Sequence, residues 1–296
     1  MDGILNINKP PGITSFGVVA RVKRLTGERR VGHAGTLDPT ASGVLPVCLG
    51  NATRIVEFLI DSGKTYRAVI ELGVTTDTYD AAGQVTRHAD PAGVGLPQLE
   101  QALASFRGAI KQTPPMFSAL KSRGRPLYKL ARAGLTIERK SRPVTIYRLD
   151  LVSWAAPLVE LEIECSKGTY VRSLANDIGE ALGCGAFLKE LVRTRSSIFD
   201  IGDAISLDML EEAVKSSDWP RFLHQVDSVL GGMPSVTLAE AQQADMRHGN
   251  VLNIPGTVPP GAGPGYCRAY TPEGRFLGIL RYLPDSGLWH PEKVFV

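Results

Sequence analysis

Segments with the hydrophobic patterns of strands and helices follow one another in this chain of 296 residues without a regular alternation. Alternation of apolar with polar residues predicts strands at 4–7, 64–74, 144–152 and 158–165. Apolar residues at helical spacing predict helices at 15–26, 96–106 and 170–182. Because no βαβ repeat connects these segments, we predict an α+β fold in which helices accompany a mixed, largely antiparallel sheet.

The composition of the chain changes near 231–234, where two glycines precede a methionine and a proline. The last 62 residues contain five basic and five acidic residues, and a helix is predicted there at 238–247. Glycine- and proline-rich turns separate short strands in the remainder of this region. We therefore predict two domains, a larger one at 1–233 and a small β-rich one at 234–296.

The overall composition excludes several classes of protein. No apolar run reaches the roughly 18 residues that a membrane-spanning helix requires, and the first residues lack the pattern of a signal peptide. The four cysteines are scattered without a Cys-x-x-Cys pair, so neither a disulfide nor a zinc site is predicted. We expect a cytoplasmic protein that has no membrane partner and binds no metal.

The segment 32–46 holds a single acid, Asp38, among glycines, small hydroxyl residues and apolar side chains. One interpretation is structural, because an aspartate followed by proline is typical of a helix N-cap, with a short helix beginning at 40–42. The other interpretation is catalytic, since a loop anchored by the apolar run at 44–49 can present a reactive acid. The nearby His33 favours the catalytic interpretation.

A basic segment at 107–148 contains eleven Lys or Arg residues and one acid, Glu138. Its net charge is 11 − 1 = +10, whereas the whole chain carries +3. This charge indicates a surface for a polyanion, and the interleaved aromatic and apolar residues favour nucleic acid. A solvated, positively charged flap is the alternative interpretation. A second basic group lies at 21–30, just before the Asp38 loop.

Three further polar residues fall on predicted elements. Tyr170 and Arg172 begin the predicted helix at 170–182, and Tyr66 lies on the predicted strand at 64–74. A carboxyl group in a dry pocket needs a cation to remain ionised, and an arginine is suited to that role. Tyr66 offers a flat face to a base. Ordinary packing of the tyrosines and solvation of Arg172 are the alternatives.

The chain lacks the common motifs of nucleotide, acyl-transfer and zinc chemistry. It has no Walker loop, no dinucleotide-binding glycine motif, no Gly-x-Ser-x-Gly elbow and no zinc-deaminase motif. A carboxylate can still act as a nucleophile toward an activated carbon, as in glycosidases. We therefore expect a redox-neutral reaction without a cofactor.

Several strings in this sequence resemble the TruB family of tRNA pseudouridine synthases. They lie at 8–15, 32–50, 61–67, 72–73, 76–80, 112–121, 165–172 and 191–195. The most specific are Gly-His-Ala-Gly-Thr-Leu-Asp-Pro and Cys-Ser-Lys-Gly-Thr-Tyr-Val-Arg. The last 62 residues resemble, more weakly, a PUA-type RNA-binding domain. One departure is at 197–198, where relatives often carry Gly-Pro and this chain carries Ser-Ile.

This resemblance implies isomerisation of uridine 55 in the T loop of tRNA to pseudouridine, by base flipping and without a cofactor or guide RNA. It implies that Asp38 is the catalytic residue. The residues expected to bind the substrate are His33, Tyr66, Tyr170, Arg172, Leu191, Lys9 and Lys64. The insertion at about 107–148 resembles an RNA-gripping element. The RNA backbone contacts expected there are Lys121, Arg123, Arg125, Lys129 and Arg132.

The T stem-loop of tRNA is therefore the expected partner, and we expect a monomer without an obligate protein partner. Three roles remain open for Asp38: attack on the sugar C1′, attack on the base, or removal of a proton from the sugar. Two other functions also remain open. One is that of a guide-dependent member of the same superfamily, and the other is that of a non-catalytic RNA-binding module.

Overall fold

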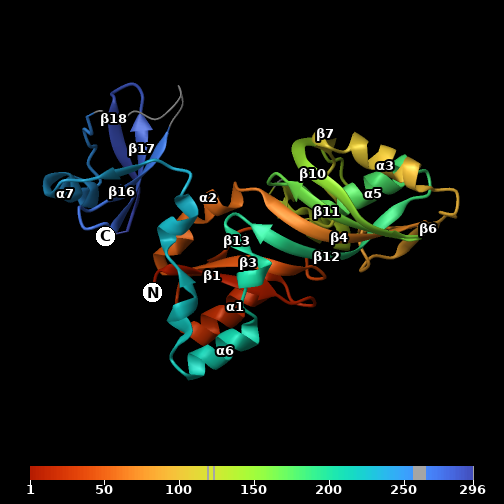
Figure 1. The fold of residues 1–296 in the computed structure, drawn as a ribbon, viewed down its shortest axis with the longest axis horizontal. Coiled ribbons are helices and arrows are strands. Elements are labelled where there is room, and N and C mark those ends of the chain that lie inside the picture. Colours follow the sequence, from red (N-terminus) through yellow and green to blue (C-terminus); the bar gives the residue numbers. More distant parts are fainter. Residues whose placement is uncertain (119, 123, 256–264, 296) are drawn as a thin grey trace.

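The computed structural model describes residues 1–118, 120–122, 124–255 and 265–295, and only the backbone of Lys121. A long, twisted sheet with helices packed against it forms the main part, and a smaller sheet lies beyond one end of it (Figure 1). None of the helices in these residues is both long and apolar enough to cross a membrane.

The large sheet has ten strands within the described residues, and eight of them form a continuous series. In spatial order these are β14 (Leu223–His224), β1 (Gly3–Lys9), β3 (Ser42–Leu49), β12 (Ala186–Ser196), β4 (Lys64–Leu72), β11 (Leu158–Cys165), β10 (Arg142–Ala155) and β7 (Gly108–Gln112). The two others are β2 (Val31–His33), which pairs with β3, and β13 (Phe199–Asp200), which pairs with β12. Only β3 and β12 pair in parallel among the described strands of this sheet. The predicted α+β fold with a largely antiparallel sheet is confirmed.

Four longer helices accompany this sheet. They are α1 (Ser15–Thr26), α3 (Leu96–Ser105), α5 (Val171–Ala181) and α6 (Leu207–Lys215). The shorter helical turns are η1 (Gly50–Ile55), α2 (Val56–Ile60), η2 (Ile201–Asp203), η3 (Trp219–Phe222) and η4 (Val226–Leu230). The Thr14 hydroxyl accepts a hydrogen bond from the Gly17 amide at the start of α1, and Gly27 ends the helix at φ 72°. The first three helices lie where the sequence predicts them, within one residue at each end.

Strands β1 and β3 are buried on both faces. Leu5 and Ile7 pack on the side of α1 and α6, whereas Ile4 and Val44 belong to a second apolar cluster. That second cluster includes Ile279 of the smaller sheet, so the two sheets share apolar contacts. Burial on both sides fixes β3 firmly, and the segment that leads into it carries Asp38.

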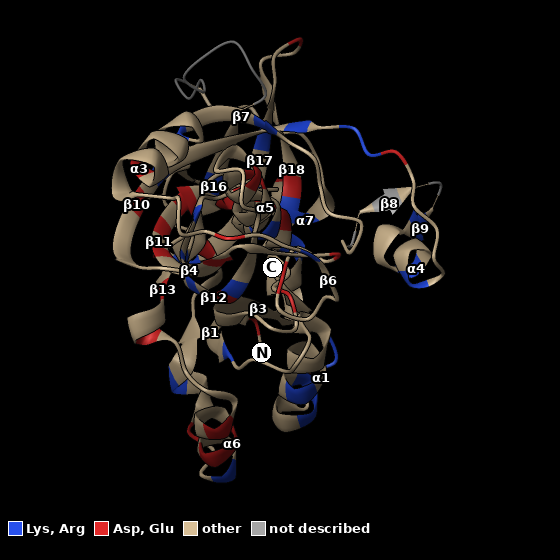
Figure 2. Cartoon of the chain, turned by 90° about the vertical axis from the view of Figure 1, so that its right-hand side faces the viewer, with Lys and Arg blue, Asp and Glu red and all other residues tan. Residues whose placement is uncertain are grey.

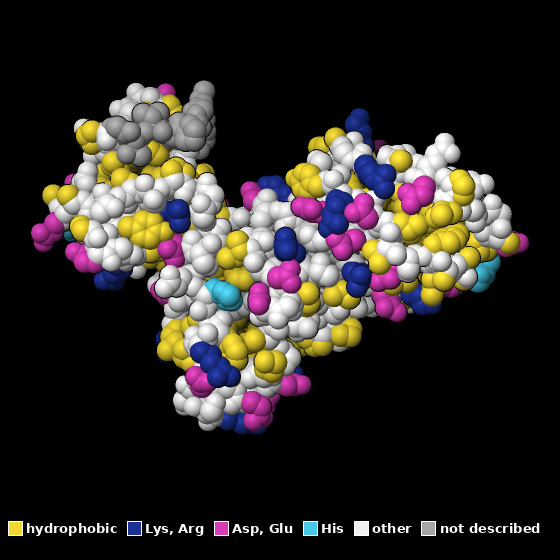
Figure 3. Space-filling model, viewed as in Figure 1, with side chains coloured by type: hydrophobic (Ala, Val, Ile, Leu, Met, Phe, Trp, Pro, Cys, Tyr) yellow, Lys and Arg dark blue, Asp and Glu magenta, His cyan; other side chains and the backbone are white. Residues whose placement is uncertain are grey.

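The outer face of the neighbouring strands is polar. Residues of β4 alternate between buried and partly exposed positions, as expected of a strand with one solvated face. On that face Arg67 Nε lies 3.1 Å from Glu160 Oε1 of β11. Figure 3 shows basic and acidic side chains intermixed over this part of the molecule. This face therefore lacks the uniform positive charge of a nucleic-acid surface.

Two details of the predicted strands are wrong or incomplete. The strand predicted at 64–74 ends at Leu72, because Gly73 adopts φ 85° and β5 (Val74–Thr76) turns away to pair with β6 (Val85–His88). The sequence pattern also fails to reveal β3 and β12. Strand β3 has no polar face, and register shifts after Leu188 and Arg193 interrupt the alternation along β12.

The smaller sheet consists of residues near the C-terminus. Its strands are β15 (Ser235–Thr237), β16 (Tyr266–Tyr270), β17 (Phe276–Leu283) and β18 (Leu288–Val294), and α7 (Glu240–His248) accompanies them. They share a core that includes Leu238, Cys267 and Trp289. The helix predicted at 238–247 begins two residues later, since Leu238 is buried in this core. The β-rich character of this region is confirmed, whereas the boundary at 233/234 stays a prediction.

The basic insertion leaves the sheet after β7 and returns at β10. Between them lie β8 (Lys121–Ser122), β9 (Arg125–Pro126) and α4 (Leu127–Arg132). Figure 2 shows these three elements standing apart from the main sheet. The part of the insertion between β7 and β10 thus projects as an arm from the edge of the sheet.

Candidate active site

Asp38 and Arg172 come together from distant parts of the chain. Asp38 lies in the irregular segment between β2 and β3, and Arg172 is the second residue of α5. Arg172 Nε lies 2.8 Å from Asp38 Oδ2, and Nη2 donates a hydrogen bond to Oδ1 at 3.0 Å. The Arg172 side chain is 5% exposed and that of Asp38 is 34% exposed. The structure therefore pairs the predicted acid with the predicted cation and leaves part of the carboxylate accessible.

The helix-cap interpretation of Asp38 is wrong. The Ala41 amide donates to the Asp38 carbonyl at 3.1 Å in a turn, and β3 begins at Ser42 without an intervening helix. The carboxylate is held by the guanidinium of Arg172 instead of by the amides of a following helix.

Buried side chains hold the Asp38 loop in place. The Ser15 hydroxyl accepts from the Leu37 amide at 2.9 Å and donates to the Leu37 carbonyl at 3.1 Å. Lys9 Nζ donates to the carbonyls of Ala41 and Pro39 at 2.6 and 3.3 Å. The backbone on both sides of Asp38 is thereby fixed before any ligand arrives, which favours a precise orientation of its carboxylate.

A second carboxylate, that of Asp80, also contacts Arg172. Its Oδ2 lies 3.4 Å from Arg172 Nη1, and its side chain is 10% exposed. The Thr78 hydroxyl donates to Asp80 Oδ1 at 2.6 Å, and the Thr78 carbonyl accepts from Arg172 Nη1 at 3.3 Å. Tyr79 between them adopts φ 63°, a conformation that is costly for a large side chain. Asp80 lies within the TruB-like string at 76–80, but the sequence predicts no role for it.

The surroundings of Asp38 disfavour its charged form. Burial raises the pKa of the Asp38 carboxyl, the guanidinium of Arg172 opposes this rise, and the negative charge of Asp80 adds to it. Arg172 therefore offsets part of the desolvation cost of an ionised acid, as the sequence predicts. A carboxyl group with a raised pKa and a fixed cation in contact is typical of a catalytic acid.

The sheet brings Tyr66 and Leu191 to neighbouring strands. Tyr66 of β4 pairs in register with Arg193 of β12, and Leu191 pairs with Ala68. Tyr66 is 9% exposed, and burial raises the pKa of its hydroxyl, while Arg193 opposes the rise. Arg193 lies within the TruB-like string at 191–195, but the sequence predicts no function for it.

The base of the basic insertion contacts the start of α5. Gln112 Nε2 donates to the Tyr170 carbonyl at 3.0 Å, and the Tyr170 amide donates to Gln112 Oε1 at 2.7 Å. Arg172 Nη2 also donates to the Phe117 carbonyl at 2.9 Å. The residues that leave β7 are therefore tied to the cation that holds Asp38.

Three remaining candidates lie near this centre with different surroundings. His33 ends β2, and burial lowers its pKa, so that its imidazole is largely neutral at pH 7. Lys64 Nζ donates to the carbonyls of Ile60 and Ser62, both at 2.5 Å. Burial lowers the pKa of Lys9 and of Lys64 to about 8. Both ammonium groups are directed at protein carbonyls, and their substrate contacts stay predictions.

Comparison with known proteins identifies the family. The family model described as "TruB family pseudouridylate synthase (N terminal domain)" matches residues 23–171, and that described as "tRNA pseudouridylate synthase B C-terminal domain" matches residues 172–230. A protein of Dehalococcoides mccartyi (strain CBDB1) named tRNA pseudouridine synthase B is 44% identical over 296 residues, covering 100% of this chain and 97% of the relative. The chain belongs to the TruB family.

Two further comparisons agree with this assignment. A Pseudomonas aeruginosa protein, also named tRNA pseudouridine synthase B, is 44% identical over 99% of this chain and 96% of its own length. The solved structure titled "Structure of H/ACA RNP bound to a substrate RNA containing 2'-deoxyuridine" is similar with a TM-score of 0.76 and 27% identity. That likeness covers 99% of this chain and 85% of the other.

In this TruB-family chain, the arm carries several exposed cations. Arg125, Lys129 and Arg132 are exposed on β9 and α4, which Figure 2 shows in blue. Lys121 lies in β8, with only its backbone described, and Arg123 lies outside the described residues.

Other cations of the basic segment serve the fold. Arg107 donates to the Leu149 carbonyl, and Arg148 pairs with Asp150 and Glu162. These two cations are therefore engaged by the protein, whereas Arg125, Lys129 and Arg132 of the arm are exposed.

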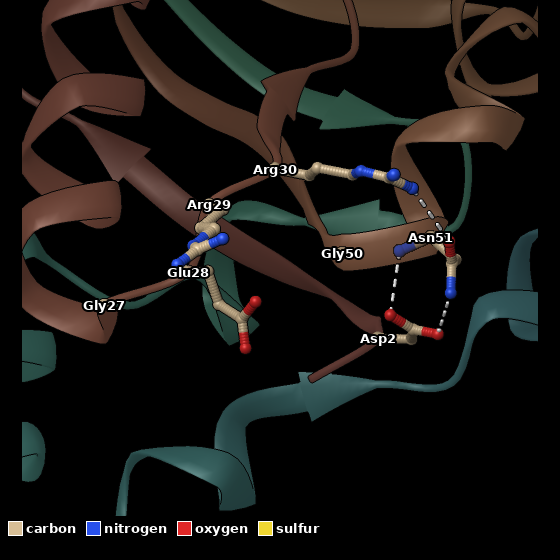
Figure 4. A pocket seen from close by; sticks show the side chains of 7 residues that line it. All are labelled: Asp2, Gly27, Glu28, Arg29, Arg30, Gly50 and Asn51. Carbon is tan, nitrogen blue, oxygen red and sulfur yellow. Dashed lines mark hydrogen bonds between the residues drawn. The ribbon is translucent and has the colours of Figure 1, made fainter.

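A separate hollow of about 300 Å³ lies at the end of β2 opposite His33 (Figure 4). The residues that line it are Asp2, Gly27, Glu28, Arg29, Arg30, Gly50 and Asn51. Asp2 accepts hydrogen bonds from the backbone amide and the side chain of Asn51 at 2.8 and 2.9 Å. None of the predicted site residues lines this hollow. Over the described part of the chain, no group of three His, Cys, Asp or Glu side chains could hold a metal ion.

Proposed function

We propose that this chain isomerises uridine 55 in the T loop of tRNA to pseudouridine. The pairing of Asp38 with Arg172 beside Tyr66, in a member of the TruB family, is the observation that carries this proposal. The relatives named tRNA pseudouridine synthase B, at 44% identity over nearly the whole chain, support tRNA as the substrate. The reaction proceeds without a cofactor or guide RNA.

The reaction breaks the bond between N1 of uracil and C1′ of the ribose and forms a bond between C5 and C1′. N1 gains a proton and C5 loses one, so atoms and electrons balance without a redox partner. A uridine within a folded loop must first leave its stack, which costs a few kcal/mol. The ring of Tyr66, buried at the floor of the site, then replaces part of the lost stacking.

Asp38 acts on the sugar or the base once the nucleotide is in place. Positive charge develops at C1′ as the glycosidic bond weakens, and a carboxylate at contact distance stabilises or traps it. Arg172 favours the ionised carboxylate and orients it through two contacts. Asp80 and Thr78 hold Arg172 from its other side.

Replacement of Asp38 by asparagine tests the catalytic assignment. We expect the single-turnover rate on a T stem-loop RNA to fall by at least about a thousandfold, because the substitution removes the reacting charge. The control is Asp61→Asn, since Asp61 is an exposed acid paired with Lys167 at 2.7 Å. Retained activity in Asp38→Asn would contradict the proposal.

A guide-dependent activity is the second candidate, because a similar solved structure is an H/ACA RNP bound to substrate RNA. The higher identity to relatives named tRNA pseudouridine synthase B and the basic insertion at 107–148 favour independent action. Purified chain and unmodified tRNA, without any other RNA, should yield pseudouridine by nucleoside mass analysis. Turnover that appears only after a guide RNA is added would favour the second candidate.

The remaining assignments follow from this function. We propose that residues 1–233 form the catalytic domain and that 234–296 form a PUA-like domain which binds RNA. The arm contacts the RNA backbone through its exposed cations, Arg125, Lys129 and Arg132 among the described side chains. The chain acts as a monomer in the cytoplasm, which agrees with its four free, buried cysteines.

A further inference from the structure

Arg193 occupies the centre of the sheet between the two halves of the site. It lies on β12, where its register partner on one side is Tyr66 of β4 and on the other side is Gly43 of β3. Strand β3 follows the Asp38 loop, and β4 carries the aromatic floor. Arg193 thus lies between β3, which follows the Asp38 loop, and β4, which carries Tyr66.

The guanidinium of Arg193 donates hydrogen bonds to the backbone on both sides of Asp38. Its Nε donates to the Val44 carbonyl at 2.7 Å, and its Nη2 donates to the Gly35 carbonyl at 3.0 Å. Gly35 lies three residues before Asp38, and Val44 lies six residues after it. The close approach of β12 requires Gly43, because a Cβ there would lie 2.2 Å from the Arg193 carbonyl oxygen.

Arg193 is 1% exposed, and it forms no ion pair with any carboxylate in the described part of the chain. Its charged neighbours include Lys9 and Lys64, and its charge lowers the pKa of both. Burying a guanidinium without a counter-ion is costly, and an apolar side chain of similar size often stabilises a core as well or better. The cost of burying this guanidinium is therefore offset by the groups to which it donates, and these lie on either side of Asp38.

Arg193 is also a cross-strand neighbour of Tyr66. Directly paired residues of an antiparallel ladder project their side chains to the same face, so Arg193 and Tyr66 are neighbours. Their interaction opposes the rise in the pKa of Tyr66 that burial causes. The group that holds the Asp38 loop therefore also acts on the Tyr66 hydroxyl through its charge.

We propose that Arg193 is a positioning residue that fixes the Asp38 loop relative to the Tyr66 hydroxyl for the isomerisation. This proposal rests on the proposed function. Lysine at this position retains the charge, but its single nitrogen lacks the rigid fork with which arginine holds two separate carbonyls. A displacement of about 1 Å in a reacting group can lower a rate by about a hundredfold.

The test compares Arg193→Lys with Arg195→Lys, a matched change on the same strand at an exposed arginine paired with Asp200. At saturating T stem-loop RNA we expect the single-turnover rate to fall about thirtyfold or more in Arg193→Lys and less than threefold in the control. The Kd for RNA should stay within threefold of the unchanged chain, because Arg193 is buried beneath the site.

A double-mutant cycle with Tyr66→Phe separates positioning from loss of stability. If Arg193 acts through the Tyr66 hydroxyl, Arg193→Lys should cost at least tenfold less in the Tyr66→Phe background. An equal cost in both backgrounds, an unchanged rate, or a lysine variant that fails to fold would overturn the proposal. An intact chain without turnover on any tRNA would instead refute the proposed function.

A readout without RNA keeps the two proposals distinguishable. With 3-fluorotyrosine placed at position 66, ¹⁹F NMR follows the ionisation of that hydroxyl within the folded range of pH. We expect its pKa to rise in Arg193→Met and to stay unchanged in Arg195→Met, because the guanidinium of Arg193 favours the phenolate. An unchanged pKa in Arg193→Met would overturn the positioning role even if the chain proved inactive on tRNA.

Discussion

Replacing Asp80 with asparagine tests how far the site depends on the second carboxylate. The change removes a charge 3.4 Å from Arg172 Nη1 and leaves the shape of the side chain almost unchanged. Asp77→Asn is the matched control, since Asp77 lies in the same turn but is exposed and accepts only from the Gln84 amide among the hydrogen bonds described. The comparison therefore separates the loss of the Asp80 charge from a general effect of the same substitution in this turn.

The expected magnitude follows from the distance and the remaining partners. At 3.4 Å and an effective dielectric constant of about 20, the gross attraction is about 5 kcal/mol. Arg172 keeps Asp38 and two backbone carbonyls, so the net loss should be smaller than for a pair without other partners. We expect the free energy of unfolding to fall by about 1–3 kcal/mol. If the same range is lost from the transition state, the rate falls by about 5- to 150-fold.

The pH dependence gives an independent check. The charge of Asp80 raises the pKa of Asp38, so its removal lowers that pKa. Because the reaction needs the ionised carboxylate, the rate rises as pH increases through the pKa of Asp38. The acid limb of the single-turnover pH profile should therefore move to lower pH in Asp80→Asn and stay in place in Asp77→Asn. An acid limb that moves upward would refute the electrostatic argument.

Three further outcomes are expected. Ser197 adopts φ 57°, so Ser197→Gly should raise the free energy of unfolding by about 0.5–1 kcal/mol in urea titrations, whereas Thr194→Gly on β12 should lower it. Removing two exposed cations of the arm with Lys129→Ala and Arg132→Ala should lower the slope of log K against log salt for tRNA by about 1.4–1.8, and an unchanged slope would exclude phosphate contacts. Between about pH 8 and its ordinary pKa of 10.5, Lys9 binds fewer protons in the folded than in the unfolded chain. Stability should therefore rise with pH in that window, and Lys9→Met should reduce the rise in denaturation measured at several pH values.

The sequence predicts well the helices and those strands that have one buried and one solvated face. In α1 the buried positions Val18, Val19 and Val22 recur at helical spacing, and Thr14 and Gly27 mark its ends. In β4 the alternation survives intact along the strand. Strands β3 and β12 carry no such signal, although they form the centre of the sheet.

The residues of the site likewise differ in whether the sequence reveals them. Asp38 and Arg172 are predictable because motif strings and the need of a buried acid for a cation both indicate them. The contribution of Asp80 depends on a turn in which Tyr79 is left-handed, and no hydrophobic pattern encodes that turn. The contribution of Arg193 depends on the order β3-β12-β4, which a local pattern does not reveal because β3 and β12 pair in parallel across a long stretch of chain.

The distribution of buried charge connects these residues to the chemistry. Four buried cations, Lys9, Lys64, Arg172 and Arg193, surround the site, whereas Asp38 and Asp80 are the carboxylates that contact Arg172 in the described residues. Two cations would balance these two carboxylates, so the residues around the site carry an excess of positive charge. As the N1–C1′ bond breaks, the sugar becomes electron-poor and the uracil becomes electron-rich. A single carboxylate beside the sugar and a cationic shell beneath the base would match that separation, and a fixed field of this kind needs no reorganisation during the reaction.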